Sequence, residues 1–202
     1  MSEPKKLLVG ITGGIGAGKT LVAKIFNLLG VPIYYADDRA KWLMTNHAPL
    51  REAIVKAFGR ESYQSDGSLN RSYLASKVFA EKHNTELING LVHPFVGEDF
   101  RTWSHRQDTP YVLKEAALLF ETGSYQELDR IITVTAPESL RIFRVLLRDP
   151  QRTKEEVKAI IDRQWADDKK KQASAFVIDN SEQKMVIPQV LKIHQQLIGP
   201  KR

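Results

Sequence analysis

The chain of 202 residues contains no cysteine. It therefore forms no disulfide, holds no zinc through thiolates and has no cysteine nucleophile, and it is compatible with a reducing compartment. No apolar run approaches the roughly 18–20 residues that are needed to span a bilayer. Residues 1–6 lead into a short apolar stretch without a small-residue cleavage site, so no secretory signal is expected. We expect a cytoplasmic protein with no membrane partner.

Low-complexity blocks, linkers and internal repeats are also absent. Apolar residues make up 42% and charged residues 27% of the chain, which is ordinary for a globular protein and excludes a largely disordered or fibrous one. A chain of this length corresponds to one domain, either alone or with a mobile subdomain. It buries roughly 70% of its unfolded surface and needs no disulfide or metal to stabilise its core.

The net charge of +6 and the pI of about 9.4 raise the question of nucleic-acid binding. The basic residues are scattered, however, and the only tight run is Lys169–Lys171. A small anionic substrate explains the excess equally well. Because no RNA- or DNA-binding motif accompanies the charge, we expect no nucleic-acid partner.

Short apolar runs alternate with amphipathic stretches along the chain. The region from Asp38 to about residue 107 is mostly helical in pattern, with a turn at Asp66-Gly67 and a helix end at His93-Pro94. A capping box of Thr153 and Glu156 predicts the start of another helix. The other predicted helices cover 19–29 and 185–198, and the predicted strands cover 7–11, 31–35, 111–113, 130–135 and 176–178. Such alternation predicts a parallel sheet covered by helices on both faces.

The sharpest motif is Gly-Gly-Ile-Gly-Ala-Gly-Lys-Thr at residues 13–20, which follows a predicted strand and precedes a predicted helix. It fits the phosphate-loop pattern G-x-x-x-x-G-K-[ST]. Glycines let the backbone wrap around phosphate oxygens, successive N–H groups form an anion nest, and the helix N-terminus adds its dipole. We expect Lys19 to reach the β- and γ-phosphates and the Thr20 hydroxyl to ligate Mg²⁺. The expected nucleotide-binding set is Gly13, Gly14, Ile15, Gly16, Ala17, Gly18, Lys19, Thr20 and Leu21.

The phosphate loop by itself leaves two questions open. A glycine-rich turn that binds nothing is the alternative to a nucleotide site. The motif also does not distinguish a kinase from an ATPase or a GTPase.

Two carboxylates follow predicted strands. Asp37 comes after the second strand, and ligands of parallel α/β sheets lie beyond the carboxyl ends of the strands. There it would accept a proton from an attacking hydroxyl, which contributes roughly 10²–10⁴-fold to a rate, or hold Mg²⁺ through water. A helix cap is the alternative for Asp37, and sequence mechanics leave both open. For Glu115, which ends the third strand, an exposed strand-end charge is favoured over support of Mg²⁺.

Three arginines, Arg141, Arg144 and Arg148, fall on one face of a predicted helix. We expect no local acid to pair with this face, which therefore suits a polyphosphate. With Arg163 from the next helix, these arginines would form a lid that excludes water and stabilises charge on the transferring phosphate. A solvated basic face is the alternative.

Taken together, the motifs resemble the dephospho-coenzyme A kinase family nearly end to end. The residues that carry the resemblance are Leu8–Lys19, Ala36-Asp37, Phe58-Gly59, Asp66–Arg71, Leu91–Pro94, Leu118–Glu121, the arginine helix and Ala175–Asn180. The resemblance implies transfer of the γ-phosphate of ATP to the ribose 3′-hydroxyl of dephospho-coenzyme A, the last step of coenzyme A synthesis.

The resemblance also implies residue roles. Asp37 matches the family's catalytic aspartate, Lys19 its phosphate-loop lysine, and Arg144 and Arg148 its lid arginines. The chain departs from the family pattern at Tyr35, which replaces a first acid, and at Leu21 and Ala117. The loss of the first acid weakens any proposal in which two carboxylates at this position share Mg²⁺.

We therefore predict a three-layer P-loop kinase fold with a five-stranded parallel sheet, a helical acceptor-binding insertion and a helical lid. The predicted core is 1–37, 109–140 and 173–202, the acceptor-binding region 38–108 and the lid 141–172. ATP, dephospho-coenzyme A and Mg²⁺ are the expected ligands of a monomer or small homo-oligomer. Another small P-loop kinase acting on a nucleoside, nucleotide or shikimate-like hydroxyl is one alternative. A nucleotide-dependent switch or nucleic-acid-binding protein is another.

Overall fold

The computed structural model describes residues 6–199. The terminal residues 1–5, which were considered for a secretory signal, and the outer ends of the predicted core lie outside this range. The chain forms two compact units. One contains the chain up to Tyr35 and from Arg106 onward, and the other is Ala36–His105. The roles predicted for the acceptor region and the lid stay predictions.

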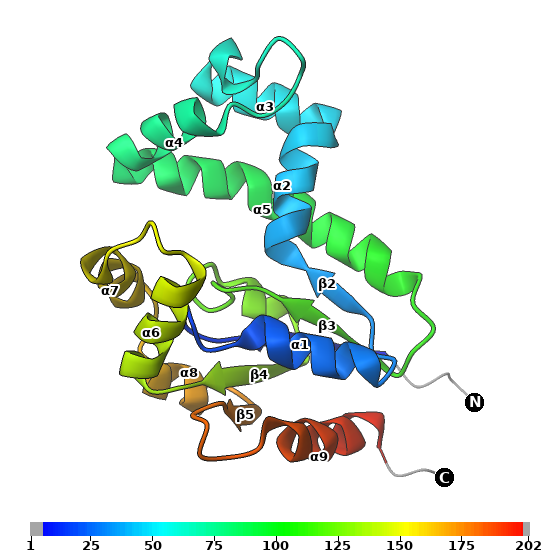
Figure 1. The fold of residues 1–202 in the computed structure, drawn as a ribbon. Coiled ribbons are helices and arrows are strands. Elements are labelled where there is room, and N and C mark those ends of the chain that lie inside the picture. Colours follow the sequence, from blue (N-terminus) through cyan, green and yellow to red (C-terminus); the bar gives the residue numbers. More distant parts are fainter. Residues whose placement is uncertain (1–5, 200–202) are drawn as a thin grey trace. The chain divides into compact units, whose positions relative to one another are not determined.

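The first unit is built on a five-stranded parallel sheet, as predicted (Figure 1). Its strand order is β2-β3-β1-β4-β5, so the strand that precedes the phosphate loop lies at the centre. All residues of β3 are buried, whereas the edge strands β2 and β5 are mostly half-buried. The strands are β1 (Leu7–Thr12), β2 (Ile33–Tyr35), β3 (Tyr111–Glu115), β4 (Arg130–Thr135) and β5 (Phe176–Asp179).

Register brings the carboxyl ends of three strands to one edge of the sheet. Glu115 of β3 lies opposite Ile11 of β1 on one side and Tyr35 of β2 on the other. Because parallel α/β sheets bind ligands beyond the carboxyl ends of their strands, this edge is the expected location of a site.

One face of the sheet is covered by α1 (Lys19–Leu28) and α9 (Val186–Ile198). Their apolar residues pack on the inward-facing residues of the central strands to form the core; these include Val22, Phe26, Val190, Ile193, Val9, Ile11, Leu113 and Ile132. On the opposite face, Gly10 lies so close to Leu119 and Leu128 that a Cβ would overlap both side chains. The segment between β3 and β4, which includes η2 (Ser124–Glu127), therefore covers that face.

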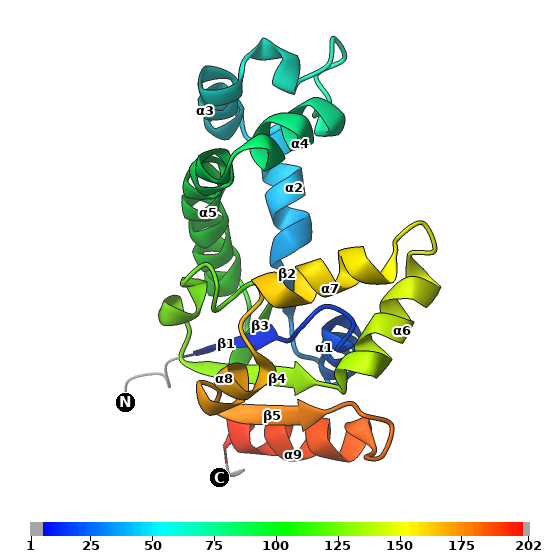
Figure 2. The ribbon, with the colours of Figure 1, turned by 90° about the vertical axis from the view of Figure 1, so that its left-hand side faces the viewer.

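A helical hairpin follows β4. It consists of α6 (Glu138–Arg148) and α7 (Lys154–Arg163), joined by a short loop (Figure 2), and α8 (Asp167–Gln172) leads from it to β5. The predicted capping box is confirmed, since the Thr153 Oγ1 accepts from the Glu156 N–H and the Glu156 carboxylate accepts from the Thr153 N–H. The hairpin has its own apolar cluster of Ile142, Val145 and Val157, with Ile15, Leu146 and Ile161 packed against it.

The second unit is helical: α2 (Ala36–Asn46), α3 (Ala48–Phe58), η1 (Arg60–Ser62), α4 (Arg71–Ala80) and α5 (Lys82–His105). The predicted helix end at His93-Pro94 is wrong, because α5 runs through Pro94. Proline removes one backbone hydrogen bond from a helix interior. The packing of α5 against α2, α3 and α4, with Val96 and Phe100 buried, offsets that loss.

Candidate active site

The phosphate loop connects β1 to α1, and two of its positions require glycine. Gly16 and Gly18 have φ of 80° and 92°, a left-handed conformation that side chains disfavour. A Cβ on Gly16 would overlap the Arg141 carbonyl, and one on Gly18 would overlap the Asn180 side chain. Both the backbone conformation and the close approach of neighbours therefore require glycine at these positions.

Side chains from three other elements hold the loop. The Ile15 N–H donates to the Gln164 Oε1 at 2.9 Å, and the buried Asn180 side chain donates to the Ala17 carbonyl at 2.8 Å. The Arg141 guanidinium lies against Gly14, where a Cβ would overlap it. A loop held in this way loses little further conformational freedom when an anion binds.

Lys19 and Thr20, the first two residues of α1, face a carboxylate at the end of β3. The Thr20 Oγ1 donates to the Glu115 Oε1 at 3.3 Å, and the Lys19 Nζ lies 3.8 Å from the same oxygen. The Glu115 side chain is only 8% exposed. The interpretation favoured from sequence, an exposed strand-end charge, is therefore wrong: parallel pairing places this strand end beside the start of α1.

The hydroxyl of Thr20 and the carboxylate of Glu115 are oxygen donors of the kind that Mg²⁺ prefers. The described residues contain no cluster of three or more His, Cys, Asp or Glu side chains that could hold a metal. An ion at Thr20 and Glu115 would therefore take its other ligands from water and from nucleotide phosphates, as Mg²⁺ commonly does. The donor set fits the predicted ion on these terms.

The arginines of α6 are paired, contrary to the expectation that no acid is nearby. Arg141 is buried, and its guanidinium lies 3.5 Å from the Asp167 carboxylate. Arg144 donates to the Asn180 carbonyl at 3.1 Å and to the Glu182 carboxylate at 3.0 Å. The partners come from α8 and from the segment after β5, which helical spacing alone does not reveal.

Arg148, at the other end of α6, is exposed. It binds the carboxylate of its neighbour Asp149 through two hydrogen bonds of 3.0 and 2.8 Å. The hydrogen bond from Arg148 holds the pKa of Asp149 below its usual range, and the same contact raises the pKa of Arg148.

Asp37 is the second residue of α2, which begins directly after β2. It therefore lies inside the first turn rather than at the cap, where a carboxylate still interacts favourably with the helix dipole. The guanidinium of Arg39 binds Asp99 of α5 at 2.9 and 2.6 Å, which ties the first turn of α2 to α5 within the helical unit. Leu21 is exposed on α1.

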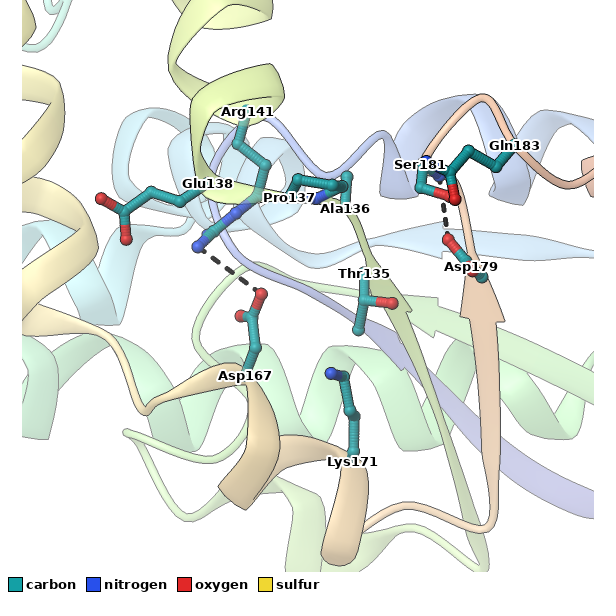
Figure 3. Close-up of a pocket in the computed structure, with 10 residues that line it drawn as sticks. All are labelled: Thr135, Ala136, Pro137, Glu138, Arg141, Asp167, Lys171, Asp179, Ser181 and Gln183. Atoms are coloured by element: carbon teal, nitrogen blue, oxygen red, sulfur yellow. Dashed lines mark hydrogen bonds and ion pairs between the residues drawn. The ribbon is translucent and has the colours of Figure 1, made fainter.

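A cavity of about 500 Å³ lies beyond the carboxyl ends of β4 and β5 (Figure 3). The Arg141–Asp167 pair forms part of its wall. Hydrogen bonds from Ser181, together with Lys184, hold the pKa of Asp179 below its ordinary value. The lining residues are Thr135, Ala136, Pro137, Glu138, Arg141, Asp167, Lys171, Asp179, Ser181 and Gln183. No sequence motif marks this cavity, because its residues come from three separate segments.

Gln164, Asn180 and Asp167 are not among the site residues predicted from the sequence. Each contacts the phosphate loop or Arg141 from more than twenty residues away in the chain. Asn180 closely follows a predicted strand and ends a segment that carries the family resemblance, whereas nothing in the sequence around Gln164 or Asp167 marks them. Among residues 6–199, no helix is long and apolar enough to cross a membrane.

Comparison with known proteins gives one consistent result. A family model described as dephospho-CoA kinase matches residues 7–185. A dephospho-CoA kinase from Bacteroides fragilis is 37% identical over 186 residues, which cover 92% of this chain and 90% of the relative.

Solved structures agree. A protein from Thermus thermophilus is 28% identical and has a TM-score of 0.83, covering 96% of this chain and 99% of the other. A dephospho-CoA kinase from Campylobacter jejuni, 24% identical with a TM-score of 0.68 over 96% and 98% of the two chains, shares the fold. With its phosphate loop, its five-stranded parallel sheet and this family match, the chain belongs to the dephospho-CoA kinase family of P-loop kinases.

Proposed function

We propose that the protein transfers the γ-phosphoryl group of ATP to the ribose 3′-hydroxyl of dephospho-coenzyme A, giving coenzyme A and ADP. The observation that carries this proposal is the family match over residues 7–185, which includes an intact phosphate loop backed by Glu115. This reaction completes coenzyme A biosynthesis.

ATP binds through its phosphates to residues 13–21 in this proposal. Backbone N–H groups of the loop and the start of α1 contact the phosphate oxygens. Lys19 contacts the β- and γ-phosphates, and Thr20 with Glu115 holds Mg²⁺. The ion supplies charge neutralisation on the phosphate oxygens when it is bound. The placement of Lys19 and Thr20 beside one buried carboxylate supports this arrangement.

Asp37 is the proposed base. The oxygen of the 3′-hydroxyl attacks the γ-phosphorus, the bond to the β–γ bridging oxygen breaks, and the hydroxyl proton passes to the Asp37 carboxylate. Support comes from chain continuity: Asp37 follows β2 by two residues, and β2 ends opposite Glu115.

The helical unit from Ala36 to His105 is the proposed acceptor-binding region, and the segment 141–172 is the proposed lid. Arg148 is the arginine of this segment that would turn to the transferring phosphate, because its side chain is exposed and its present partner, Asp149, is only its neighbour in the sequence. Arg144 would leave Glu182 for the same purpose. We further infer a cytoplasmic monomer or small homo-oligomer without a nucleic-acid partner, in line with the missing cysteines and missing nucleic-acid motifs.

The test is ADP formation with Mg-ATP and a panel of acceptors: dephospho-coenzyme A, adenosine, AMP and shikimate, each against a control without acceptor. We expect turnover with dephospho-coenzyme A alone and a product heavier by one phosphate. Turnover with another acceptor would overturn the substrate. ADP formation that is independent of acceptor would overturn phosphoryl transfer itself.

A further inference from the structure

Ile15 connects the phosphate loop to the α6–α7 hairpin through its side chain. The side chain packs on the hairpin cluster of Ile142, Val145 and Val157. Val145 and Val157 are fully buried, so this cluster is a close-packed unit rather than a loose surface contact. This packing therefore couples the position of the middle of the phosphate loop to the position of the hairpin.

The backbone of Ile15 makes a second connection to the same hairpin. Its N–H donates to the Gln164 Oε1 at 2.9 Å, and Gln164 is the residue that directly follows α7. The N–H of Gln164 in turn donates to the Ile161 carbonyl, which closes the last turn of α7. The side-chain oxygen thus joins the end of a helix to one N–H of the phosphate loop.

The residues after Gln164 are anchored to the body of the first unit. The Trp165 N–H donates to the Glu121 Oε1 at 2.7 Å, and the fully buried Lys170 ammonium lies 3.1 Å from the same carboxylate oxygen. The Trp165 ring stacks on Phe120 with centroids 5.1 Å apart. Gln164 is therefore the boundary between this fixed base and the exposed helix α7.

We propose that Gln164 is a positioning residue for ATP: its side-chain oxygen holds Ile15, and through Ile15 the phosphate loop, in register with the end of α7. The inference rests on the proposed function, in which ATP binds this loop. It predicts that the oxygen of Gln164, and not its amide nitrogen, matters for ATP affinity. The KM for the acceptor, dephospho-coenzyme A, is not expected to depend on Gln164.

The experiment compares three variants with the wild-type chain: Gln164→Leu, which removes the acceptor oxygen, Gln164→Glu, which keeps it, and Gln172→Leu. Gln172 is an exposed residue at the end of α8 and serves as the matched control. Loss of one hydrogen bond is expected to raise the KM for ATP about three- to tenfold in Gln164→Leu, with the KM for dephospho-coenzyme A unchanged. High ionic strength screens the charge that Gln164→Glu adds, and under that condition this variant is expected to recover most of the ATP affinity.

Amide exchange of Ile15, measured by NMR, reports the contact directly. We expect faster exchange in Gln164→Leu and near-wild-type exchange in Gln164→Glu and Gln172→Leu. If Gln164→Leu does not fold, Gln164→Asn, which withdraws the oxygen by one methylene, replaces it with the same expectations.

Two results would overturn the proposal: a KM for ATP in Gln164→Leu within twofold of wild type, or equal impairment of Gln164→Leu and Gln164→Glu at high ionic strength. Calorimetry measures ATP binding by the same variants without any need for turnover. It therefore tests the role of Gln164 independently of the proposed function. A wild-type chain that binds ATP but does not phosphorylate dephospho-coenzyme A would refute the function, while the ATP affinities of the variants still decide the role of Gln164.

Discussion

The two ends of α6 carry the same residue in opposite settings. Arg141, in the first turn, is 5% exposed, lies against Gly14 of the phosphate loop and pairs with Asp167 of α8. Arg148, in the last turn, has a side chain that is 64% exposed and pairs with its neighbour Asp149. Helical spacing puts both on one face and does not distinguish them.

This difference in burial indicates that the two arginines have different roles. Removing one partner of a buried ion pair is destabilising, because it leaves an uncompensated charge. Arg141 is therefore expected to keep its position beside Asp167. A surface pair contributes little to stability and exchanges readily for a stronger anion. We therefore assign Arg141 to the support of the phosphate loop and propose Arg148 for the transferring phosphate.

The largest effect that tests this comparison comes from replacing each arginine by methionine. Arg148→Met is expected to lower kcat on the order of a hundredfold, because it removes one cationic group from the transition state, with Tm unchanged. Arg141→Met is expected to lower Tm by roughly 5–10 °C, because it leaves Asp167 without its partner. Thermal unfolding and steady-state kinetics on both variants measure the two effects.

The opposite pattern of effects would contradict the roles given to the two arginines. If Arg141→Met kept its Tm, or if Arg148→Met kept its kcat, the contrast in burial would not predict function. Lys158→Met, at an exposed position of α7, controls for loss of a surface cation.

The next effect concerns Glu115, whose buried carboxylate faces Lys19 and Thr20. Glu115→Gln keeps the shape and removes the charge. We expect a fall in kcat of roughly 10–100-fold and a higher Mg²⁺ requirement, as for groups that support a metal site. Kinetics at a series of Mg²⁺ concentrations measure this, and a Mg²⁺ requirement equal to that of wild type would show that Glu115 only orients Lys19 and Thr20.

The smallest effect belongs to residues away from the phosphate loop. The Tyr111 hydroxyl is 2.7 Å from the His194 Nδ1, and burial lowers the pKa of His194 from 6.5. Between the folded pKa and 6.5 the unfolded chain binds more protons, so the free energy of unfolding falls as pH drops below 6.5. His194→Gln is expected to flatten this slope in denaturant unfolding at several pH values and to leave kcat unchanged. A slope that persists in the variant would assign it to other groups.

The sequence predicts local features well and long-range partners poorly. Apolar runs located every strand, and the glycine spacing located the loop, because both are set by residues close in the chain. Pro94 misled the prediction because packing of α5 outweighs one lost hydrogen bond. Glu115 and the arginine partners were misjudged because their environment comes from parallel pairing and from α8, which spacing does not encode.

We propose that Asp37 is the base that accepts the proton of the 3′-hydroxyl. The most direct measurement follows formation of coenzyme A from ATP and dephospho-coenzyme A by mass spectrometry, for the wild-type chain and Asp37→Asn in parallel, with ATP affinity measured on both. We expect coenzyme A from the wild type and a rate lower by roughly 10²–10⁴-fold in Asp37→Asn, with ATP affinity close to wild type. Near-wild-type turnover in Asp37→Asn would contradict it.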